Sequence, residues 1–356
     1  MLNNTYIDDI MDSFNGSESA QKAIEEINLV IEKGGFSIKK WVTSNTNDEE
    51  VDINTNDHHV LGMIWDRVKD VLKYQINSSM FEKYNVNGSM FNISPPERVT
   101  KRIILSCMNT IFDPLGLLAP YTMKAKLLMK NLWIQKFEWD DEIDGIDRLK
   151  FVEFLKEMTS IKDVVFKRSL KPEGAVGEPV LITFSDASKD AFGACCYLRW
   201  RLQDNTYTSI LIASKNRVAP LKVISIVRLE LCGAVIAKRL AQFVESEMRF
   251  NIEKRYFFVD SEIVRSMIAK ESHAFKTFVA VRLGEIHEAT KVQEWHWINT
   301  VHNVADWITR GKTPTELNEN SIWQNGPCFL SKTETEWPIN RTIITDPLSE
   351  ENRVAI

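Results

Sequence analysis

The chain has 356 residues and a mass of 41.0 kDa, which is long for one hydrophobic core and predicts roughly two or three domains. Hydrophobic residues make up 44% and charged residues 26% of the sequence, and these proportions exclude a disordered or collagenous protein. No apolar run approaches the ~18 residues of a membrane helix, and the first residues lack a signal-peptide pattern. The five cysteines include no Cys-x-x-Cys pair, so we expect a cytoplasmic protein without a zinc or disulfide framework.

The first 75 residues have the pattern of the end of an α/β unit. Residues 5–10 are apolar, then acidic, then apolar, which is typical of a tight hairpin. Apolar side chains then recur at helical spacing, and Ser17 and the pair Gly34-Gly35 are typical of a helix start and stop. The remaining pattern predicts a strand over 36–41, a loop over 45–57 and a strand over 60–65.

From about residue 75 to 172 the pattern is mostly helical. Pro95-Pro96-Glu97 is typical of a helix start, and the Asp-Pro-Leu-Gly segment at 113–116 predicts an interruption. A further helix is predicted over 121–136. The stretch 171–179 contains two prolines and two glycines and is the clearest linker of the chain.

The third stretch alternates strands and helices. Three strands joined by short polar turns are followed by a long amphipathic helix, a fourth strand, two helices, a fifth strand and a short helix. The strands are predicted over 180–184, 192–200, 207–213, 256–259 and 292–298. This order predicts an α/β fold with a mixed five-stranded sheet and helices on its faces.

Four acidic residues occupy the ends of these elements. Asp186 follows the first strand, Glu230 lies near the start of the long helix, Asp260 ends the fourth strand, and Asp306 precedes the last short helix. Such positions meet at one rim of a sheet, where converging carboxylates repel one another unless divalent cations neutralise them. Each of these residues alone is typical of a solvent-exposed residue that caps a helix or ends a strand. Their joint placement predicts a site for two Mg²⁺ ions, which could activate a water molecule to hydrolyse a phosphodiester bond.

The segments around these acids resemble a retroelement ribonuclease H. They are Ser185-Asp186-Ala187-Ser188 with Gly193-Ala194, Arg228-Leu229-Glu230-Leu231, Val259-Asp260-Ser261, and Asn303-Val304-Ala305-Asp306 with Arg310-Gly311. More narrowly, residues 1–338 resemble part of the pol polyprotein of a BEL/Pao-type LTR retrotransposon. Supporting segments lie at 34–41, 60–65, 111–120, 213–221 and 323–327.

This resemblance implies a division of the chain into four parts. Residues 1–75 would be the C-terminal part of a truncated reverse transcriptase palm, and 76–172 a thumb- or connection-like, mostly helical region of the Pao family. Residues 173–315 would form an RNase H-like domain, and 316–356 a C-terminal extension.

The implied activity is hydrolysis of the RNA strand of RNA–DNA hybrids, with Asp186, Glu230, Asp260 and Asp306 as catalytic metal ligands. Asp186 would bridge two Mg²⁺ ions, and Mn²⁺ could replace them. The implied partners are the hybrid and the remainder of the pol polyprotein, and the implied location is the cytoplasm, or a virus-like particle if the element is active. The oligomeric state stays open.

The same resemblance makes Tyr6-Ile7-Asp8-Asp9 the Tyr-x-Asp-Asp hairpin of the polymerase, with Asp8 and Asp9 as its metal ligands. A palm needs a further carboxylate from an upstream strand, and the fingers that hold the template precede it as well. We therefore expect no polymerase activity from this chain and expect it to be a fragment of a longer reading frame.

Two features concern assisting groups and nucleic acid. Relatives tend to end the fifth strand with Arg-His, whereas this chain has His296-Trp297, so the imidazole has moved by one residue and faces the other side of a strand. His296 and His302 are therefore the possible assisting groups.

Residues 210–256 carry nine basic and four acidic side chains. Within them, a basic loop over 214–222 with Lys215, Asn216 and Arg217 could contact phosphates of a nucleic acid. Simple solvation of a charged loop is the alternative.

Two other functions remain open. A degenerate fragment could bind nucleic acid or protein without catalysis. The family region around 113–116 also carries the label Pao retrotransposon peptidase. An aspartic peptidase needs Asp-Thr-Gly or Asp-Ser-Gly, which the sequence lacks, so we interpret Asp113 before Pro114 as a turn residue.

Overall fold

The computed structural model describes residues 5–6, 9–14, 16–44, 57–60, 62–76, 96–339 and 351. The chain divides into two compact units, residues 1–51 and residues 52–356, and each is described by itself. Within the described ranges, no helix combines the length and the apolar character that a membrane crossing requires.

The first unit contains a hairpin and one helix. Strands β1 (Thr5–Tyr6) and β2 (Asp9–Ile10) pair antiparallel, which confirms the predicted hairpin, although Asp8 lies outside the described residues. Helix α1 (Ser17–Lys33) is confirmed, but Ser17 is not its cap, because Gly16 occupies that position with φ 99° and no side-chain bond.

The strand predicted over 36–41 is wrong, because this segment is irregular in the structure. It folds back against α1 instead of pairing in a sheet, and the Trp41 Nε1 atom donates a hydrogen bond to Asn28 Oδ1 at 3.0 Å. Phe36, whose place in the alternating apolar pattern predicts a strand residue, has a side chain that is 74% exposed. A short alternating pattern therefore does not make a strand where no neighbour offers a ladder of hydrogen bonds.

The second unit begins with a small antiparallel sheet. Its order is β3 (Asp57–Val60), β4 (Met63–Asp66), β5 (Val71–Lys73) and β6 (Val165–Lys167). The single strand predicted over 60–65 is partly confirmed, because β4 contains residues 63–65, but Gly62 has φ 80° and turns the apolar run into a hairpin between β3 and β4. The sequence also gave no sign of β6, which lies in the stretch predicted as helical. The predicted loop over 45–57 lies almost wholly outside the described residues.

Three helices follow in this unit: α3 (Lys101–Met108), α4 (Ala119–Ile134) and α5 (Gly145–Met158). The predicted helix start at Pro95-Pro96-Glu97 is wrong, because Thr100 caps α3 by accepting a hydrogen bond from the Ile103 amide. The predicted interruption at 113–116 is confirmed. There the Asp113 carboxylate accepts hydrogen bonds from the backbone amides of Leu117 and Leu118 at 2.9 and 2.8 Å, which is the behaviour of a turn residue.

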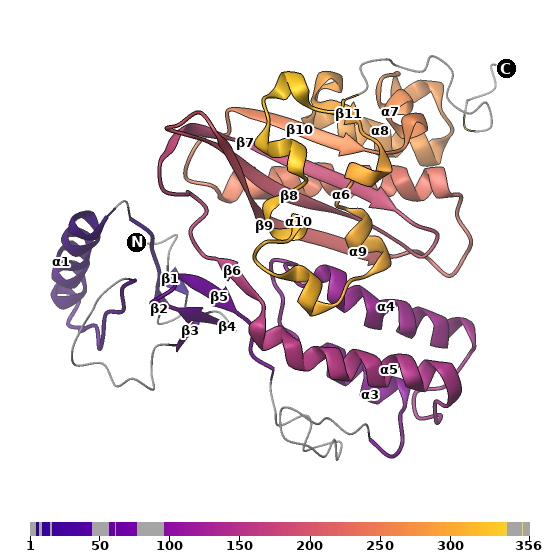
Figure 1. Cartoon of the computed structure of the whole chain (residues 1–356), viewed down its shortest axis with the longest axis horizontal. Coiled ribbons are helices and arrows are strands. Elements are labelled where there is room, and N and C mark those ends of the chain that lie inside the picture. Colours follow the sequence, from indigo (N-terminus) through magenta and orange to yellow (C-terminus); the bar gives the residue numbers. More distant parts are fainter. Residues whose placement is uncertain are drawn as a thin grey trace. The chain divides into compact units, whose positions relative to one another are not determined.

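The main sheet has the order β11-β10-β7-β8-β9 (Figure 1). Its strands are β7 (Ala175–Ala187), β8 (Ala191–Leu202), β9 (Tyr207–Val218), β10 (Lys254–Val259) and β11 (Trp295–Trp297). Strands β7, β8 and β9 form an antiparallel meander, while β10 lies parallel to β7, and β11 lies parallel to β10. This is the mixed five-stranded sheet that the sequence predicted.

Two predicted irregular segments belong to this sheet. The linker over 171–179 is partly wrong, because β7 already begins at Ala175 and pairs there with Leu202. The basic loop over 214–222 is also partly wrong, because β9 continues to Val218, which lies opposite Ala191. In both cases strand pairing extends the ladder through residues whose composition suggests a turn.

The two faces of the sheet bury alternate residues of each strand. On one face, Leu181 and Phe257 share a core with α6 (Ile226–Glu247), α7 (Glu262–Ile268) and α8 (Thr277–Ala289). On the other face, Ile182 and Phe258 belong to a second core.

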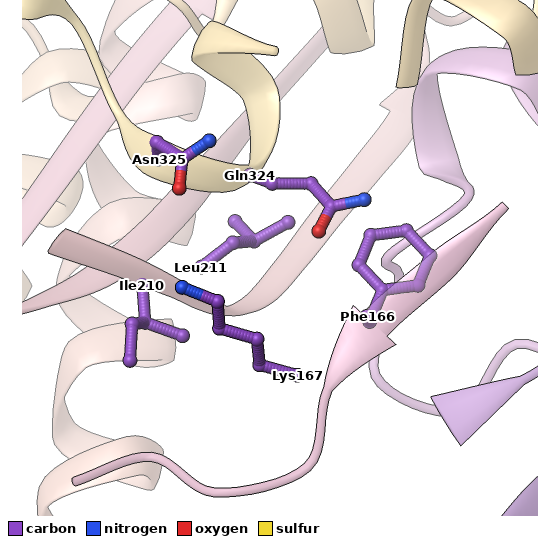
Figure 2. Close-up of a pocket in the computed structure, with 6 residues that line it drawn as sticks. All are labelled: Phe166, Lys167, Ile210, Leu211, Gln324 and Asn325. Carbon is purple, nitrogen blue, oxygen red and sulfur yellow. The ribbon is translucent and has the colours of Figure 1, made fainter. Parts of the chain in front are cut away.

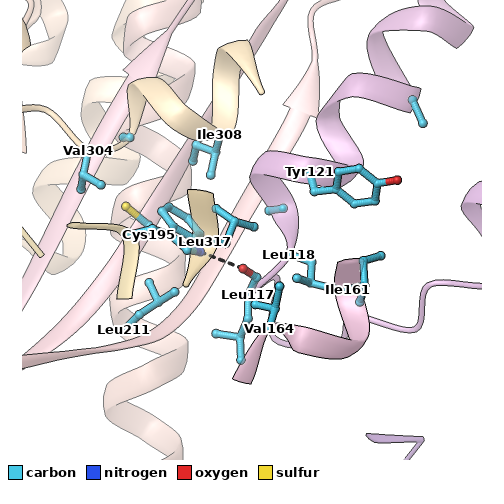
Figure 3. Packing of buried hydrophobic residues seen from close by; sticks show 14 of the residues in the cluster. Leu117, Leu118, Tyr121, Ile161, Val164, Cys195, Leu211, Val304, Ile308 and Leu317 are labelled. Carbon is cyan, nitrogen blue, oxygen red and sulfur yellow. Dashed lines mark hydrogen bonds between the residues drawn. The ribbon is translucent and has the colours of Figure 1, made fainter. Parts of the chain in front are cut away.

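The second core joins the sheet to segments on both sides of it in sequence. Leu117 and Tyr121 come from the α4 region, Ile308 from α9 (Asp306–Arg310), and Leu317 from the C-terminal extension (Figure 3). The Trp323 Nε1 atom in α10 (Ile322–Asn325) donates a hydrogen bond to the Leu117 carbonyl at 2.8 Å. The described core is thus continuous across residues 172 and 315, where sequence patterns predict domain boundaries.

A buried arginine fixes the extension to the sheet. Arg199 on β8 is 3% exposed and donates hydrogen bonds to the carbonyls of Leu330 and Lys332 at 2.7 and 2.6 Å. Nearby, Gln324 of α10 extends toward Phe166 in a small pocket between β6, β9 and α10 (Figure 2) and donates to the Val165 carbonyl at 2.8 Å. The extension is therefore an integral layer of the fold.

Candidate active site

Three of the four predicted acidic residues converge at one rim of the main sheet. Asp186 lies at the end of β7, Glu230 in the second turn of α6, and Asp260 directly after β10. One carboxylate oxygen from each lies within 4.8 Å of the others. The parallel pairing of β7 with β10 causes this arrangement, because it places the carboxyl ends of both strands at the same edge.

Glycine allows α6 to approach the strand that carries Asp186. A Cβ atom at Gly233 would lie 3.0 Å from the Asp186 carbonyl oxygen, and one at Gly193 would lie 2.5 Å from the Lys215 carbonyl oxygen. Side chains at these positions would force the backbones apart. The close approach brings Glu230 to the end of β7.

The fourth acid, Asp306, lies beside this cluster and has a different partner. It is the first residue of α9, and its carboxylate forms an ion pair with Arg310 on the same helix. It does not belong to the group of three within 4.8 Å. The Thr309 hydroxyl, which lies 3.1 Å from the Asp306 carbonyl oxygen, also contacts the Asp186 carboxylate, and the charge of Asp306 contributes to raising the pKa of Asp186 and of Asp260.

Three further residues hold the cluster, and sequence reasoning missed their roles. The Thr309 hydroxyl, 1% exposed, donates a hydrogen bond to Asp186 Oδ2. The Trp297 Nε1 atom donates to the Asp260 carbonyl at 2.8 Å, and Asn303 Nδ2 donates to the Ser185 carbonyl at 2.9 Å. Thr309 follows Asp306 by three residues, so helical spacing was the one signal that could have identified it.

Burial and mutual repulsion keep these carboxylates from ionising easily. Burial, followed by the charge of Asp260, raises the pKa of Asp186 to about 7. Burial and the charges of Asp186 and Asp260 raise the pKa of Glu230 to about 9, and burial also raises the pKa of Asp260. A partly buried set of carboxylate oxygens is the kind of donor set that Mg²⁺ and Mn²⁺ prefer, so these residues fit the expected cations.

Glu230→Gln is expected to stabilise the protein when metal is absent. Because the fold raises the pKa of Glu230, the folded state holds a proton that the unfolded state releases, and stability falls as the pH rises toward 9. The variant removes this loss, so its melting temperature at pH 8 in EDTA should rise by roughly 2–4 °C for each kcal/mol of relieved repulsion. At pH 5 the two proteins should melt alike; an equal shift at both pH values would contradict the electrostatic explanation.

The two candidate histidines lie among aromatic side chains. The His296 ring on β11 is 5.3 Å from the Tyr256 ring and 5.9 Å from the Phe258 ring, and the His302 ring is 6.0 Å from that of Phe329. The next residue along β11, Trp297, points to the acidic rim and binds the Asp260 carbonyl. The order His296-Trp297 therefore places a tryptophan, and not a histidine, beside the acidic residues, while His296 packs among aromatic rings.

The three candidate phosphate-binding residues divide by side-chain direction along β9. Lys215 and Arg217 are exposed, whereas Asn216 is half-buried between them. The Asn216 carboxamide accepts a hydrogen bond from Lys126 and donates to the carbonyls of Ala119 and Ile308. Lys215 and Arg217 therefore lie on the surface, and Asn216 is used inside the fold.

Comparison with known proteins gives one family match. Residues 100–261 match the model of the Pao retrotransposon-like RNaseH-like domain, a range that includes Asp186, Glu230 and Asp260. A comparison with curated proteins gave no match.

Two solved structures are similar over much of the chain. The foamy viral protease-reverse transcriptase dRH in complex with double-stranded DNA is 13% identical, with a TM-score of 0.36, over 69% of this chain and 36% of that one. The foamy viral protease-reverse transcriptase in complex with double-stranded DNA is 12% identical, with a TM-score of 0.39, over 81% of this chain and 52% of that one. The chain thus spans about a third to a half of these proteins. The residues that match the family model supply strands β7 to β10 of the mixed five-stranded sheet and the carboxylates of Asp186, Glu230 and Asp260.

Proposed function

We propose that the chain is a metal-dependent endonuclease that hydrolyses the RNA strand of RNA–DNA hybrids and leaves a 3′-hydroxyl. The observation that carries this proposal is the convergence of Asp186, Glu230 and Asp260 within 4.8 Å at the rim of an RNaseH-like sheet. Three carboxylates this close together, one of them buried and two partly buried, repel one another and destabilise a protein unless they serve a bound cation. The family match supports the same reading.

In this proposal Asp186, Glu230 and Asp260 would hold two Mg²⁺ ions, and Asp306 would complete the set of ligands from α9. When bound, these ions supply a water of lowered pKa and neutralise charge on the phosphate. The protein's own contribution is to orient the ligands. Thr309 fixes one oxygen of Asp186, and Trp297 fixes the backbone from which the Asp260 side chain extends.

The register of the sheet suggests how a hybrid would lie on this site. Asp186 is paired with Gly193, and Gly193 is paired with Asn216, so these three positions form one row across β7, β8 and β9. Lys215 and Arg217 flank the end of that row and are exposed. We assign phosphate contacts to these two side chains, which would give binding that depends on salt and not on base sequence.

The hairpin that contains Tyr6 and Asp9 is, under the same proposal, the polymerase turn of a reverse transcriptase palm. The remainder of the pol polyprotein is its proposed partner. We assign no polymerisation to the residues described.

The full chain should cleave a 5′-labelled RNA strand annealed to DNA in Mg²⁺, stop completely in EDTA, and resume when Mg²⁺ is restored. Single-stranded RNA and duplex DNA should stay intact in parallel reactions, and a polymerase should extend the RNA products from their 3′ ends. Tight hybrid binding without cleavage in either Mg²⁺ or Mn²⁺ would overturn the enzymatic proposal and favour a binding module.

A further inference from the structure

The segment around Asp113-Pro114-Leu115-Gly116, singled out in the sequence, has no part in the proposed chemistry, yet it packs beside the site. We infer that this segment and α4 act through Asn216 to position α9, and with it the carboxylate of Asp306. Asn216 is therefore a positioning residue. The inference deepens the proposed function and rests on it for the role of Asp306.

The segment first covers the exposed edge of the sheet. Strand β9 is the last strand of its sheet, and the Ser214 amide donates to the Leu115 carbonyl at 2.9 Å. Gly116 has φ 72°, and a Cβ atom there would lie 2.1 Å from the Ser214 carbonyl oxygen. Both the positive φ and the close approach require glycine at this position. The contact also gives the backbone of β9 a hydrogen-bond partner at an edge that could otherwise pair with another strand.

Asn216 then joins three elements through one carboxamide. Its Oδ1 atom accepts a hydrogen bond from Lys126 Nζ of α4 at 2.8 Å. Its Nδ2 atom donates to the carbonyl of Ala119, the first residue of α4, at 3.2 Å, and to the carbonyl of Ile308 in α9 at 3.1 Å. Both amide hydrogens and the amide oxygen are thus engaged, so no other side chain of this size could replace it.

Helix α9 depends on such neighbours because it spans only residues Asp306–Arg310. A helix this short has little stability of its own. The Lys312 amide, just beyond it, donates to the Pro120 carbonyl of α4 at 3.1 Å. On the other side, Ile308 packs over Gly193, where a Cβ atom would lie 2.9 Å from its Cδ1 atom.

The chain of contacts therefore runs from the 113–116 turn to the metal ligands. Asp113 accepts hydrogen bonds from the amides of Leu117 and Leu118 just before α4, Lys126 of α4 binds Asn216, and Asn216 binds the backbone of α9. One residue further, Thr309 binds Asp186. Loss of the hydrogen bonds that Asn216 donates should therefore make α9 less stable. It should leave β7 and α6, which carry Asp186 and Glu230, in place.

Hydrogen–deuterium exchange of the full chain tests this directly with Asn216→Leu, which keeps the branched shape of the side chain and removes the hydrogen bonds. We expect the amides of Ile308 and Gly311, which are bonded to Ala305 and Trp307, to exchange about tenfold faster, with β7 and α6 unchanged. Lys130→Met is the matched control, because this α4 lysine binds Asp190 instead and should leave α9 unchanged. Unchanged exchange in α9, or a rise throughout the chain, would overturn the inference.

A double-mutant cycle with Asp306→Asn tests whether Asn216 acts through Asp306. Asn216→Leu should raise the Mn²⁺ concentration needed for half-saturation several-fold, and should add nothing when Asp306 is already Asn. Additive effects would contradict the inference. A wild-type chain that neither binds Mn²⁺ nor cleaves hybrid would refute the proposed function, while the exchange experiment would still decide whether Asn216 positions α9.

Discussion

Replacing Asp186 by Asn is expected to reduce hybrid cleavage by a factor of about a thousand or more. The Asp186 carboxylate lies within 4.8 Å of those of Glu230 and Asp260 and would hold the proposed cations with them, so the variant loses one ligand of the set. A loss of several kcal/mol of cation stabilisation corresponds to this factor, at ~1.4 kcal/mol for each tenfold change. The effect is measured as the single-turnover rate on a 5′-labelled hybrid in Mg²⁺.

The fold and the hybrid affinity of Asp186→Asn should be preserved. Asparagine has the same shape, its Oδ1 atom can still accept the Thr309 hydroxyl, and Lys215 and Arg217 stay exposed. Asp190→Asn is the matched control, because Asp190 lies in the next turn of the chain and pairs with Lys130 at 3.1 Å. Comparable losses in both variants would indicate a general charge effect and would contradict the assigned role of Asp186.

Arg199→Leu is expected to destabilise the protein by about 3 kcal/mol or more. The side chain is 3% exposed and donates to the carbonyls of Leu330 and Lys332. Its removal breaks two hydrogen bonds from a charged donor, worth ~1.5–3 kcal/mol each. The Lys332 carbonyl keeps the Trp337 Nε1 donor, whereas the buried Leu330 carbonyl is left unsatisfied. Each such unsatisfied group costs ~1–3 kcal/mol. The segment that these carbonyls anchor also buries Trp337 against Phe258, with ring centroids 5.8 Å apart. Equilibrium unfolding in urea measures the difference.

Arg201→Leu on the same strand serves as the control for Arg199→Leu. It removes the same charge from an exposed position two residues away and should change stability by no more than ~0.5 kcal/mol. If the two variants unfold alike, the C-terminal extension is not anchored as the structure indicates.

Much of the main sheet could be predicted because its signals are local. The apolar strands, the polar turns between them and the amphipathic helix before β10 each repeat with the period of their own element. The convergence of Asp186, Glu230 and Asp260 follows from that order, since the carboxyl ends of neighbouring parallel strands share one edge.

The errors in the fold arose where pairing or packing overrides local pattern. Gly62 turns an apolar run into a hairpin, and β6 forms because residues 165–167 find an edge in β5, about ninety residues earlier in the chain. Composition alone suggested a linker over 171–179, although β7 begins within it. Such pairings are long-range and leave no signal in a short window of sequence.

The supporting residues of the site were hidden for the same reason. Thr309 binds a carboxylate 123 residues away, and Asn303 binds a carbonyl 118 residues away. Asn216 was grouped with Lys215 and Arg217 as a phosphate contact, but alternation along β9 turns its side chain toward α4 and α9. Its assignment required the structure.

The most direct test of the central claim is a calorimetric titration of Mn²⁺ into the metal-free full chain and into its Asp260→Asn variant at the same pH. If Asp186, Glu230 and Asp260 form one cation site, the wild type should show saturable binding with release of protons, because the folded protein raises the pKa of all three groups. The variant should bind at least about tenfold more weakly. Identical binding curves, or no saturable binding in the wild type, would contradict the account.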